Sequence, residues 1–137
     1  MKCLKKGFDE KEAKMGYDLR IQVDGDVLRV TATGTRSFET VLAMSQDILA
    51  ICVEKKLKKV LIDVLALEGR LSTIDAYEIS GKHFPKMRYR GVIARCAVVD
   101  LKEFEETYRF FENVAVNRGL SFRIFSDTDE AIAWLKN

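Results

Sequence analysis

The chain has 137 residues, of which 47% are hydrophobic and 32% are charged, and its 23 basic and 21 acidic residues give a net charge of +2. This length and composition predict one globular domain with its own core. The balanced charge argues against a nucleic-acid-binding surface, and no apolar run approaches the roughly 18 residues that a membrane-spanning helix needs. Because residues 1–16 lack the apolar segment of a signal peptide, we expect a cytoplasmic protein.

The three cysteines are Cys3, Cys52 and Cys96. Their odd number and wide spacing indicate neither a zinc site nor a redox pair. Cys52 falls in an apolar helical pattern and Cys96 in an apolar strand pattern. Both are therefore predicted to be small core residues in a reducing compartment.

The N-terminal residues 1–16 are charged and show no clear period, which predicts a mobile leader or a loosely attached helix. The domain itself is predicted at residues 17–137. No internal repeat and no low-complexity tract divides this part of the chain, and Pro85 is its only proline. One continuous domain is therefore expected after the leader.

A hairpin opens the predicted domain. Apolar and polar residues alternate over 18–23 and again over 27–34, the period of two that marks half-buried strands. Between them lies Asp24-Gly25, a strong signal for a tight turn because glycine accepts positive φ. We expect these two strands to be antiparallel neighbours.

Residues 37–56 carry apolar side chains at three- and four-residue spacing, the pattern of an amphipathic helix. Ser37 is a natural N-cap, and Glu39 follows in the first turn. Lysines gather at the far end, where cations complement the helix dipole; a nucleic-acid patch is the alternative interpretation. The apolar face is predicted to contain Phe38, Val41, Leu42, Ile48, Leu49 and Cys52, together with Ser45.

Strands and helices then alternate to the end of the chain. Near-continuous apolar runs predict strands that are covered on both faces, and glycine or proline marks the helix ends. The order β-β-α-β-α-β-α-β-α predicts an α/β domain with a single open mixed sheet, mostly parallel, with an antiparallel N-terminal hairpin at one edge. The later strands are predicted at 59–67, 90–100 and 121–125, and the later helices at 72–84, 101–119 and 126–137, the last capped by Ser126 or Asp127.

The residues that could support catalysis are few. His83 is the only histidine, and its predicted place late in a helix favours a dipole or surface role over a Ser-His-Asp or Cys-His mechanism. Asp63, Glu68 and Asp100 at strand ends could form a carboxylate pair, but we interpret Asp63 as a hydrogen-bond partner of the adjacent loop backbone. Glycine-rich phosphate loops and calcium loops are absent from the sequence. We therefore expect no enzyme, no metal and no cofactor.

The third predicted helix is unusually aromatic. Phe104, Tyr108 and Phe111 fall on one face of it, which is either core or the lining of an apolar pocket. Ile74 and Tyr77 of the preceding helix would complete such a pocket. The sequence leaves both interpretations open.

A loop between a strand and a helix carries two hydroxyls in the stretch LIDVLALEGRLSTIDAYEI, residues 61–79. Ser72, followed three residues later by Asp75, fits a capping box. Ser72 is therefore predicted to cap the helix, and Thr73 is predicted to be its first residue, with its hydroxyl facing solvent. Either hydroxyl could belong to a switch or an interaction site.

This stretch, together with VDGDVLRVTATG, FFENVAVNRG and FSDTDEAIAWL, makes residues 17–136 similar to the STAS domains, which are the anti-sigma-factor-antagonist (SpoIIAA-like) family. The likeness is closer to an uncharacterised bacterial branch of that family. The resemblance implies the SpoIIAA-like fold and a non-enzymatic protein. The fold also resembles lipid-exchange domains of the CRAL-TRIO kind, which implies a small non-polar ligand as an alternative to a protein partner.

In STAS domains an Asp-Ser-Ser-Gly loop begins the second helix, and a partner kinase phosphorylates its second serine. In this chain Asp63 matches the acidic strand residue, Ser72 the first serine and Thr73 the phospho-acceptor, whereas Leu71 and Ile74 replace the aspartate and the glycine. The resemblance therefore implies Thr73 or Ser72 as phospho-acceptor or interaction residues for a regulatory protein partner. A homodimer is a further arrangement that the sequence leaves open.

Overall fold

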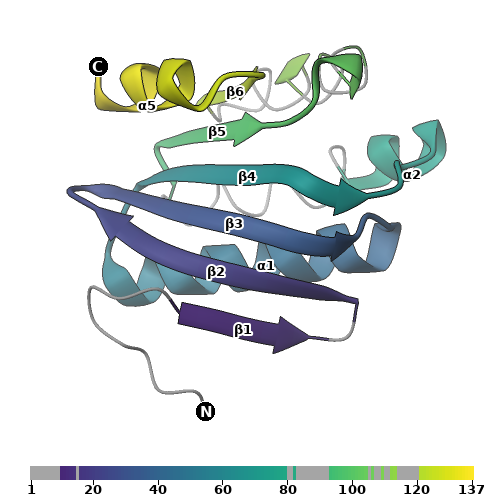
Figure 1. The fold of residues 1–137 in the computed structure, drawn as a ribbon, viewed down its shortest axis with the longest axis horizontal. Helices are drawn as coiled ribbons and strands as arrows, with labels where there is room; N and C mark the ends of the chain where they lie inside the picture. The colour runs from purple at the N-terminus through teal and green to yellow at the C-terminus, as the bar shows by residue number, and fades with distance from the viewer. Residues whose placement is uncertain are drawn as a thin grey trace.

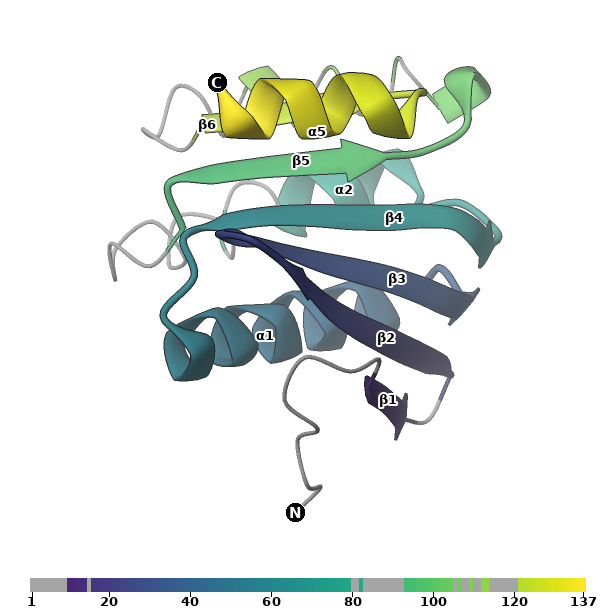
Figure 2. The ribbon, with the colours of Figure 1, turned by 60° about the vertical axis from the view of Figure 1, so that its left-hand side comes forward.

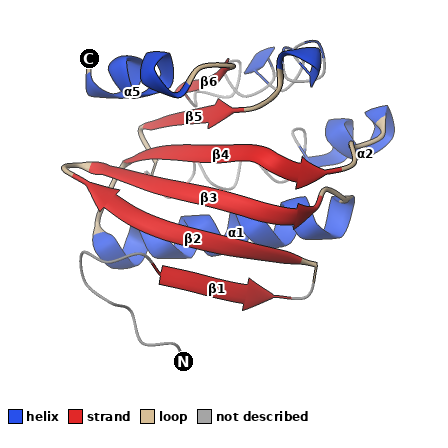
Figure 3. Cartoon of the chain, viewed as in Figure 1, coloured by secondary structure: helices blue, strands red, loops and turns tan. Residues whose placement is uncertain are grey.

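The computed structural model describes residues 10–14, 16–79, 82, 93–104, 106, 109, 112–113 and 121–137, with the backbone alone for residues 10–14 and 73. Its strands form one sheet in the order β1-β2-β3-β4-β5-β6 (Figure 1 and Figure 3). The strands are β1 (Glu10–Lys14), β2 (Tyr17–Asp24), β3 (Val27–Thr35), β4 (Lys59–Glu68), β5 (Arg95–Val99) and β6 (Ser121–Phe125), and the helices are α1 (Phe38–Lys55), α2 (Thr73–Glu78), the 3-10 turn η2 (Lys102–Phe104) and α5 (Thr128–Lys136).

The sheet is mixed, as the sequence predicts. β1, β2 and β3 pair antiparallel, whereas β3, β4, β5 and β6 pair parallel. Asp24 and Val27 close the predicted hairpin between β2 and β3, and Gly25 between them has a φ of +64°. The α/β class and the mostly parallel sheet are therefore confirmed.

The N-terminal prediction differs from the structure in one respect. Glu10–Lys14 does not form a loosely attached helix or an unpaired leader but the strand β1, which pairs with β2 over five residues. The sequence EKEAK contains no large apolar residue. It therefore lacks the alternation of apolar and polar residues that predicts a strand. The strand is defined by its backbone pairing to the edge of β2.

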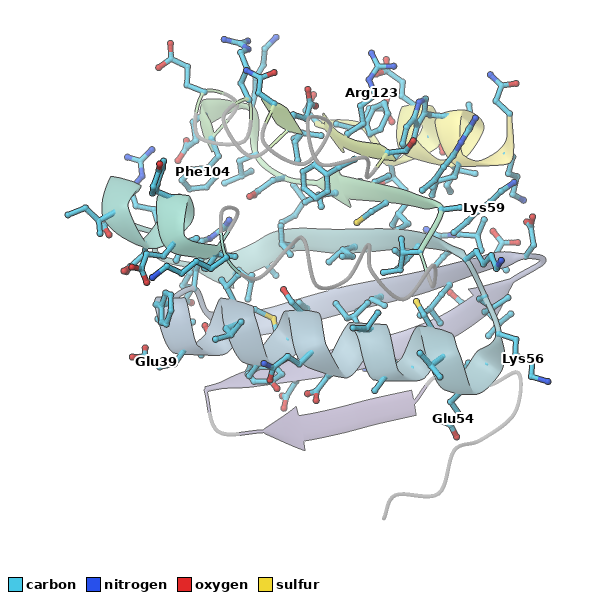
Figure 4. The ribbon with its side chains drawn as sticks, turned by 180° about the vertical axis from the view of Figure 1, so that it is seen from behind. Glu39, Glu54, Lys56, Lys59, Phe104 and Arg123 are labelled. Carbon is cyan, nitrogen blue, oxygen red and sulfur yellow. The ribbon has the colours of Figure 1, made fainter. Side chains whose placement is uncertain are left out.

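Two cores lie on opposite faces of the sheet. On the first face, α1 packs Met44, Ile48 and Cys52 against strand residues such as Leu28 and Val30. On the second face, α5 packs against β4 and β5. That smaller core contains Val27, Leu61, Ala97, Val99, Ala131 and Leu135. Figure 2 shows α5 above β5 and in front of β6, with α1 behind β2, and Figure 4 shows the α1 face from the other side.

The helix α1 ends in a strained residue. Ser37 caps its start as predicted, by accepting the backbone N–H of Thr40, and the Thr40 hydroxyl accepts the N–H of Ser37 in return. At the other end Lys56 is the C-cap with φ 58° and ψ 40°, the left-handed region, which glycine normally occupies. The Lys56 N–H nevertheless closes the helix on the carbonyls of Cys52 and Val53.

We expect Lys56→Gly to raise the free energy of unfolding by about 0.5–1 kcal/mol, because it removes a left-handed cost of about 1–2 kcal/mol and adds a chain-entropy cost of about 0.5–1 kcal/mol. Urea unfolding measures this difference. Lys55→Gly is the matched control, since Lys55 is the last helical residue and glycine there should lower stability. Equal effects of the two changes would contradict the strain at Lys56.

The C-terminal helix α5 agrees with its prediction. Asp127 is its N-cap and accepts the N–H of Asp129, while Ala131 and Leu135 are buried. Trp134 packs against Phe125 of β6, with 5.8 Å between the ring centroids. The two helices between β4 and β6 are described only in part. Beyond Glu78 and beyond Phe104 the predicted helices at 72–84 and 101–119 lie mostly outside the described residues, and so do His83 and the expected end at Gly119.

Candidate interaction site

The carboxyl ends of the parallel strands meet at one edge of the sheet, and the residues of interest lie there. The loop after β3 leads into α1, the loop after β4 leads into α2, and the turn after β5 leads into η2. Figure 4 shows Glu39 and Phe104 at this end of the molecule and Lys56 and Lys59 at the opposite end. Open parallel sheets place their ligands and partners at this edge.

The helix α2 begins as predicted. Ser72 is its N-cap, with extended backbone angles of φ −71° and ψ 161°, and its Oγ accepts the backbone N–H of Asp75 at 3.1 Å. Thr73 is the first helical residue. Gly69 has a φ of +92° in the loop before the cap, which turns the chain out of β4. The structure thus confirms the capping role of Ser72 and leaves its role as a phospho-acceptor, like that of Thr73, a prediction.

The two sides of α2 differ sharply. Ala76 and Ile79 are 3% and 0% exposed and pack into the larger core, which also contains Met44, Ile48 and Cys52 of α1. Ile74 and Tyr77, three residues apart on the other side, are 74% and 64% exposed. They are the two most exposed large hydrophobic side chains among the described residues. Figure 1 shows α2 standing out from the end of the sheet.

The apolar pocket predicted from the aromatic helix is only partly visible. Ile74 and Tyr77 lie on the outer side of α2, whereas Phe104 is 8% exposed and belongs to η2. Tyr108 and Phe111 lie outside the described residues. The pocket therefore stays a prediction.

A buried ion pair ties the strand ends together. Arg36, just after β3, donates from Nη1 to Asp100 Oδ2 at 2.7 Å and from Nη2 to Oδ1 at 3.4 Å. The side chains of Arg36 and Asp100 are 6% and 0% exposed. Asp100 Oδ1 also accepts the N–H of Leu101 at 2.7 Å, and the Asp100 N–H donates to the carbonyl of Phe125. A carboxylate held in this way serves the structure and is not available as a general base.

The ring of Phe104 lies against this pair. The Arg36 guanidinium carbon is 4.7 Å from the ring centroid, and that of Arg70, from the loop before α2, is 5.1 Å from it. Both distances fall in the range of cation–π contacts. Phe104 thus joins the ends of β3 and β4 to the turn that follows β5.

Sequence reasoning did not find Arg36, Arg70 or this use of Phe104. The signal available was an arginine one or two residues before each helix-capping serine, in TRS and in GRLS. Arginine is common in both positions as a surface residue, so the pattern alone does not reveal a buried pair. Only the sheet order, which sets β3, β4 and β5 side by side, brings these side chains together.

Other candidate chemistries have structural explanations. Asp63 Oδ1 accepts the N–H of Leu65 at 3.0 Å, where β4 carries an extra residue relative to β3. Asp63 therefore bonds to backbone as predicted, but within the strand β4 and not in a loop. Cys52 and Cys96 are buried as predicted. Burial raises the pKa of the Cys52 thiol to about 11 and raises the pKa of Cys96 as well, which keeps both protonated and unreactive near neutral pH.

Candidate metal sites and membrane-spanning helices are absent from the described residues. In that part of the chain, no group of three or more His, Cys, Asp or Glu side chains is arranged to hold a metal ion. Among the helices that the structure describes, none is long and apolar enough to cross a bilayer.

Known proteins resemble this chain in fold but not closely in sequence. No protein-family model and no curated protein matches this chain. Among solved structures it is similar to an uncharacterised DUF3478-family protein with a SpoIIAA-like fold from Shewanella loihica PV-4, with 21% identity, coverage of 97% of this chain and 99% of that one, and a TM-score of 0.51. The chain adopts a SpoIIAA-like fold.

The same SpoIIAA-like fold appears in a second solved structure. An anti-sigma factor antagonist from Mycobacterium paratuberculosis is 16% identical, with coverage of 91% of this chain and 98% of that one and a TM-score of 0.58. The match spans nearly the whole of both proteins, so the fold expected from the resemblance is confirmed. Identities this low establish the fold alone, and function has to be argued from the site.

Proposed function

We propose that this SpoIIAA-like domain is a non-enzymatic, cytoplasmic binding module that docks a regulatory protein through the loop and helix beginning at Ser72. The observation that carries the proposal is the outer side of α2, where Ile74 and Tyr77 are 74% and 64% exposed while Ala76 and Ile79 hold the helix in the core. A large aliphatic and an aromatic side chain on a fixed helix are suited to anchor a protein interface. The anti-sigma factor antagonist with the same fold adds support for a protein partner.

The proposed mode of binding is helix-to-groove docking. A short helix that presents apolar anchors three residues apart fits an apolar groove on a partner. Ser72 and Thr73 lie at the start of the same helix, so a phosphate on either would add about −1.5 to −2 charges beside these anchors. Asp75 in the first turn would oppose that charge. We therefore propose that phosphorylation of Thr73 or Ser72 changes the affinity for the partner, because it changes the charge at the start of α2.

Site-specific photo-crosslinking in the source cells tests the docking surface. A photo-crosslinking amino acid at position 77 should capture one discrete protein, because Tyr77 is expected to lie within the interface. The same amino acid at position 53 is the matched control, since Val53 is 52% exposed on the outer side of α1. Identical products from the two positions, or no product from position 77, would contradict the proposal.

The captured protein, once purified, allows a quantitative test. Ile74→Asp should weaken its binding by about tenfold or more, because truncating or charging an interface anchor costs at least about 1–2 kcal/mol. Val53→Asp should leave the affinity unchanged. Isothermal titration calorimetry measures both, and mass spectrometry of the protein from cells shows whether Ser72 or Thr73 carries a phosphate. An unaltered affinity for Ile74→Asp places the interface elsewhere.

A further inference from the structure

The loop that leads into α2 carries one exposed cation that rests on a buried ring. This loop runs from Gly69 to Ser72, and its Arg70 is exposed, yet the Arg70 guanidinium carbon lies 5.1 Å from the centroid of the Phe104 ring. Phe104 belongs to η2, more than thirty residues further along the chain. The contact therefore joins the start of the proposed docking helix to a different strand-to-helix connection.

The surface on which Arg70 rests is fixed. Phe104 is 8% exposed, and its ring also contacts the guanidinium of Arg36 at 4.7 Å. Arg36 in turn is bound to Asp100 by two hydrogen bonds, and Asp100 accepts the N–H of Leu101, one residue before η2. The Phe104 ring, the Arg36–Asp100 ion pair and the turn η2 are thus held together by buried contacts. Arg70 is exposed and can move off the ring while this ion pair stays intact.

The other residues of the loop face the larger core and the end of β3. Leu71 is half-buried against the larger core, and Ser72 caps α2. A side chain at Gly69 would stand 3.4 Å from the carbonyl oxygen of Arg36, so the loop backbone passes close to the end of β3. Arg70, which lies over the Phe104 ring, contacts η2 from this loop.

We propose that Arg70 and Phe104 form a latch that sets the position of the start of α2 and couples it to η2. This inference rests on the proposed function in one respect, because it takes α2 to be the helix that docks the partner. An exposed cation–π contact is weak enough to open, and a charge-assisted hydrogen bond from Arg70 to a carboxylate is stronger than the stack. A partner with an acidic group beside the loop would therefore draw Arg70 off the ring and release α2 from η2.

Amide hydrogen exchange in the free, full-length protein tests the latch without any partner. In Arg70→Gln the amides of Asp75 and Ala76, which bond to Ser72, should exchange about two- to fivefold faster, the factor expected from losing one exposed cation–π contact. The Phe104 amide, which bonds to the carbonyl of Leu101, should exchange faster by a similar factor. Phe104→Leu should accelerate the Asp75 amide as well, although the two residues are far apart in sequence.

Arg123→Gln is the matched control, because the Arg123 guanidinium carbon lies 5.6 Å from the centroid of the Phe125 ring, which packs against the α5 core and not against α2. It should leave the Asp75 and Ala76 amides unchanged. Unchanged exchange at Asp75 in Arg70→Gln, or equal acceleration in Arg123→Gln, would overturn the latch. Neither result bears on the crosslinking at position 77, so failure of the latch and failure of the docking surface are distinguishable.

Discussion

Asp100→Ala is expected to lower the free energy of unfolding by about 3–5 kcal/mol, because it leaves the Arg36 guanidinium buried without its carboxylate. Both side chains are almost fully buried, so solvent cannot replace the lost partner. The change also removes the acceptor of the Leu101 N–H. Urea unfolding followed by the fluorescence of Trp134, the single tryptophan, measures the loss.

A double-mutant cycle of Arg36→Met and Asp100→Asn, each measured alone and together, separates the ion pair from other effects of the substitutions. Arg36→Met alone should also destabilise, since it leaves Asp100 charged and buried. Combined with Asp100→Asn, which keeps an acceptor for Leu101, it should recover much of the stability, because no uncompensated charge is left. Losses that simply add in the double variant would show that Arg36 and Asp100 do not act as a pair.

Gly34→Ala is expected to destabilise the protein by at least about 3 kcal/mol. Gly34 has a φ of +123°, a conformation in which a side chain is strained. A Cβ there would overlap the carbonyl oxygen of Gly16 and approach the Cα of Tyr17 to 2.6 Å. Because these backbone atoms belong to the first residue of the paired strand β2 and to the residue before it, relief requires the start of β2 and the end of β3 to separate.

Gly25→Ala is the control for Gly34→Ala. Gly25 in the hairpin also has a positive φ, +64°, but nothing lies within 4 Å of the position of its Cβ. It should therefore lose only the left-handed cost of about 1–2 kcal/mol. Thermal unfolding of both variants compares the two, and similar losses would mean that the close approach of β2 and β3 at Gly34 is relieved without cost.

Most of the fold could be predicted because its elements carry local signals. Alternation over β2 and β3 and the turn at Gly25 identified the hairpin, and the caps Ser37 and Ser72 fixed two helix starts to the residue. β1 could not be predicted, since its stability depends on pairing with β2 and not on an apolar face of its own. A period in the sequence reports burial, and a strand held by backbone hydrogen bonds alone leaves no such period.

The candidate site was predictable only in part. The loop, the cap and the start of α2 follow from the residues 61–79, and the resemblance pointed to Ser72 and Thr73. The outward direction of Ile74 and Tyr77 was not predicted, because apolar residues in a short helix are by default assigned to the core. Their exposure is decided by Ala76 and Ile79, which occupy the side of α2 that the core can accept.

The sequence by itself determined the class of fold, the order of most elements and the residues that cap the helices, because periodicity and capping act between neighbours a few residues apart. The tertiary structure alone decided which strand ends meet. Arg36, Arg70 and Phe104 are separated by tens of residues, and each is an unremarkable surface or helix residue in its local context. They come together because the parallel strands β3, β4 and β5 bring their carboxyl ends to one edge, where a buried charge needs its opposite and a ring can accept two cations.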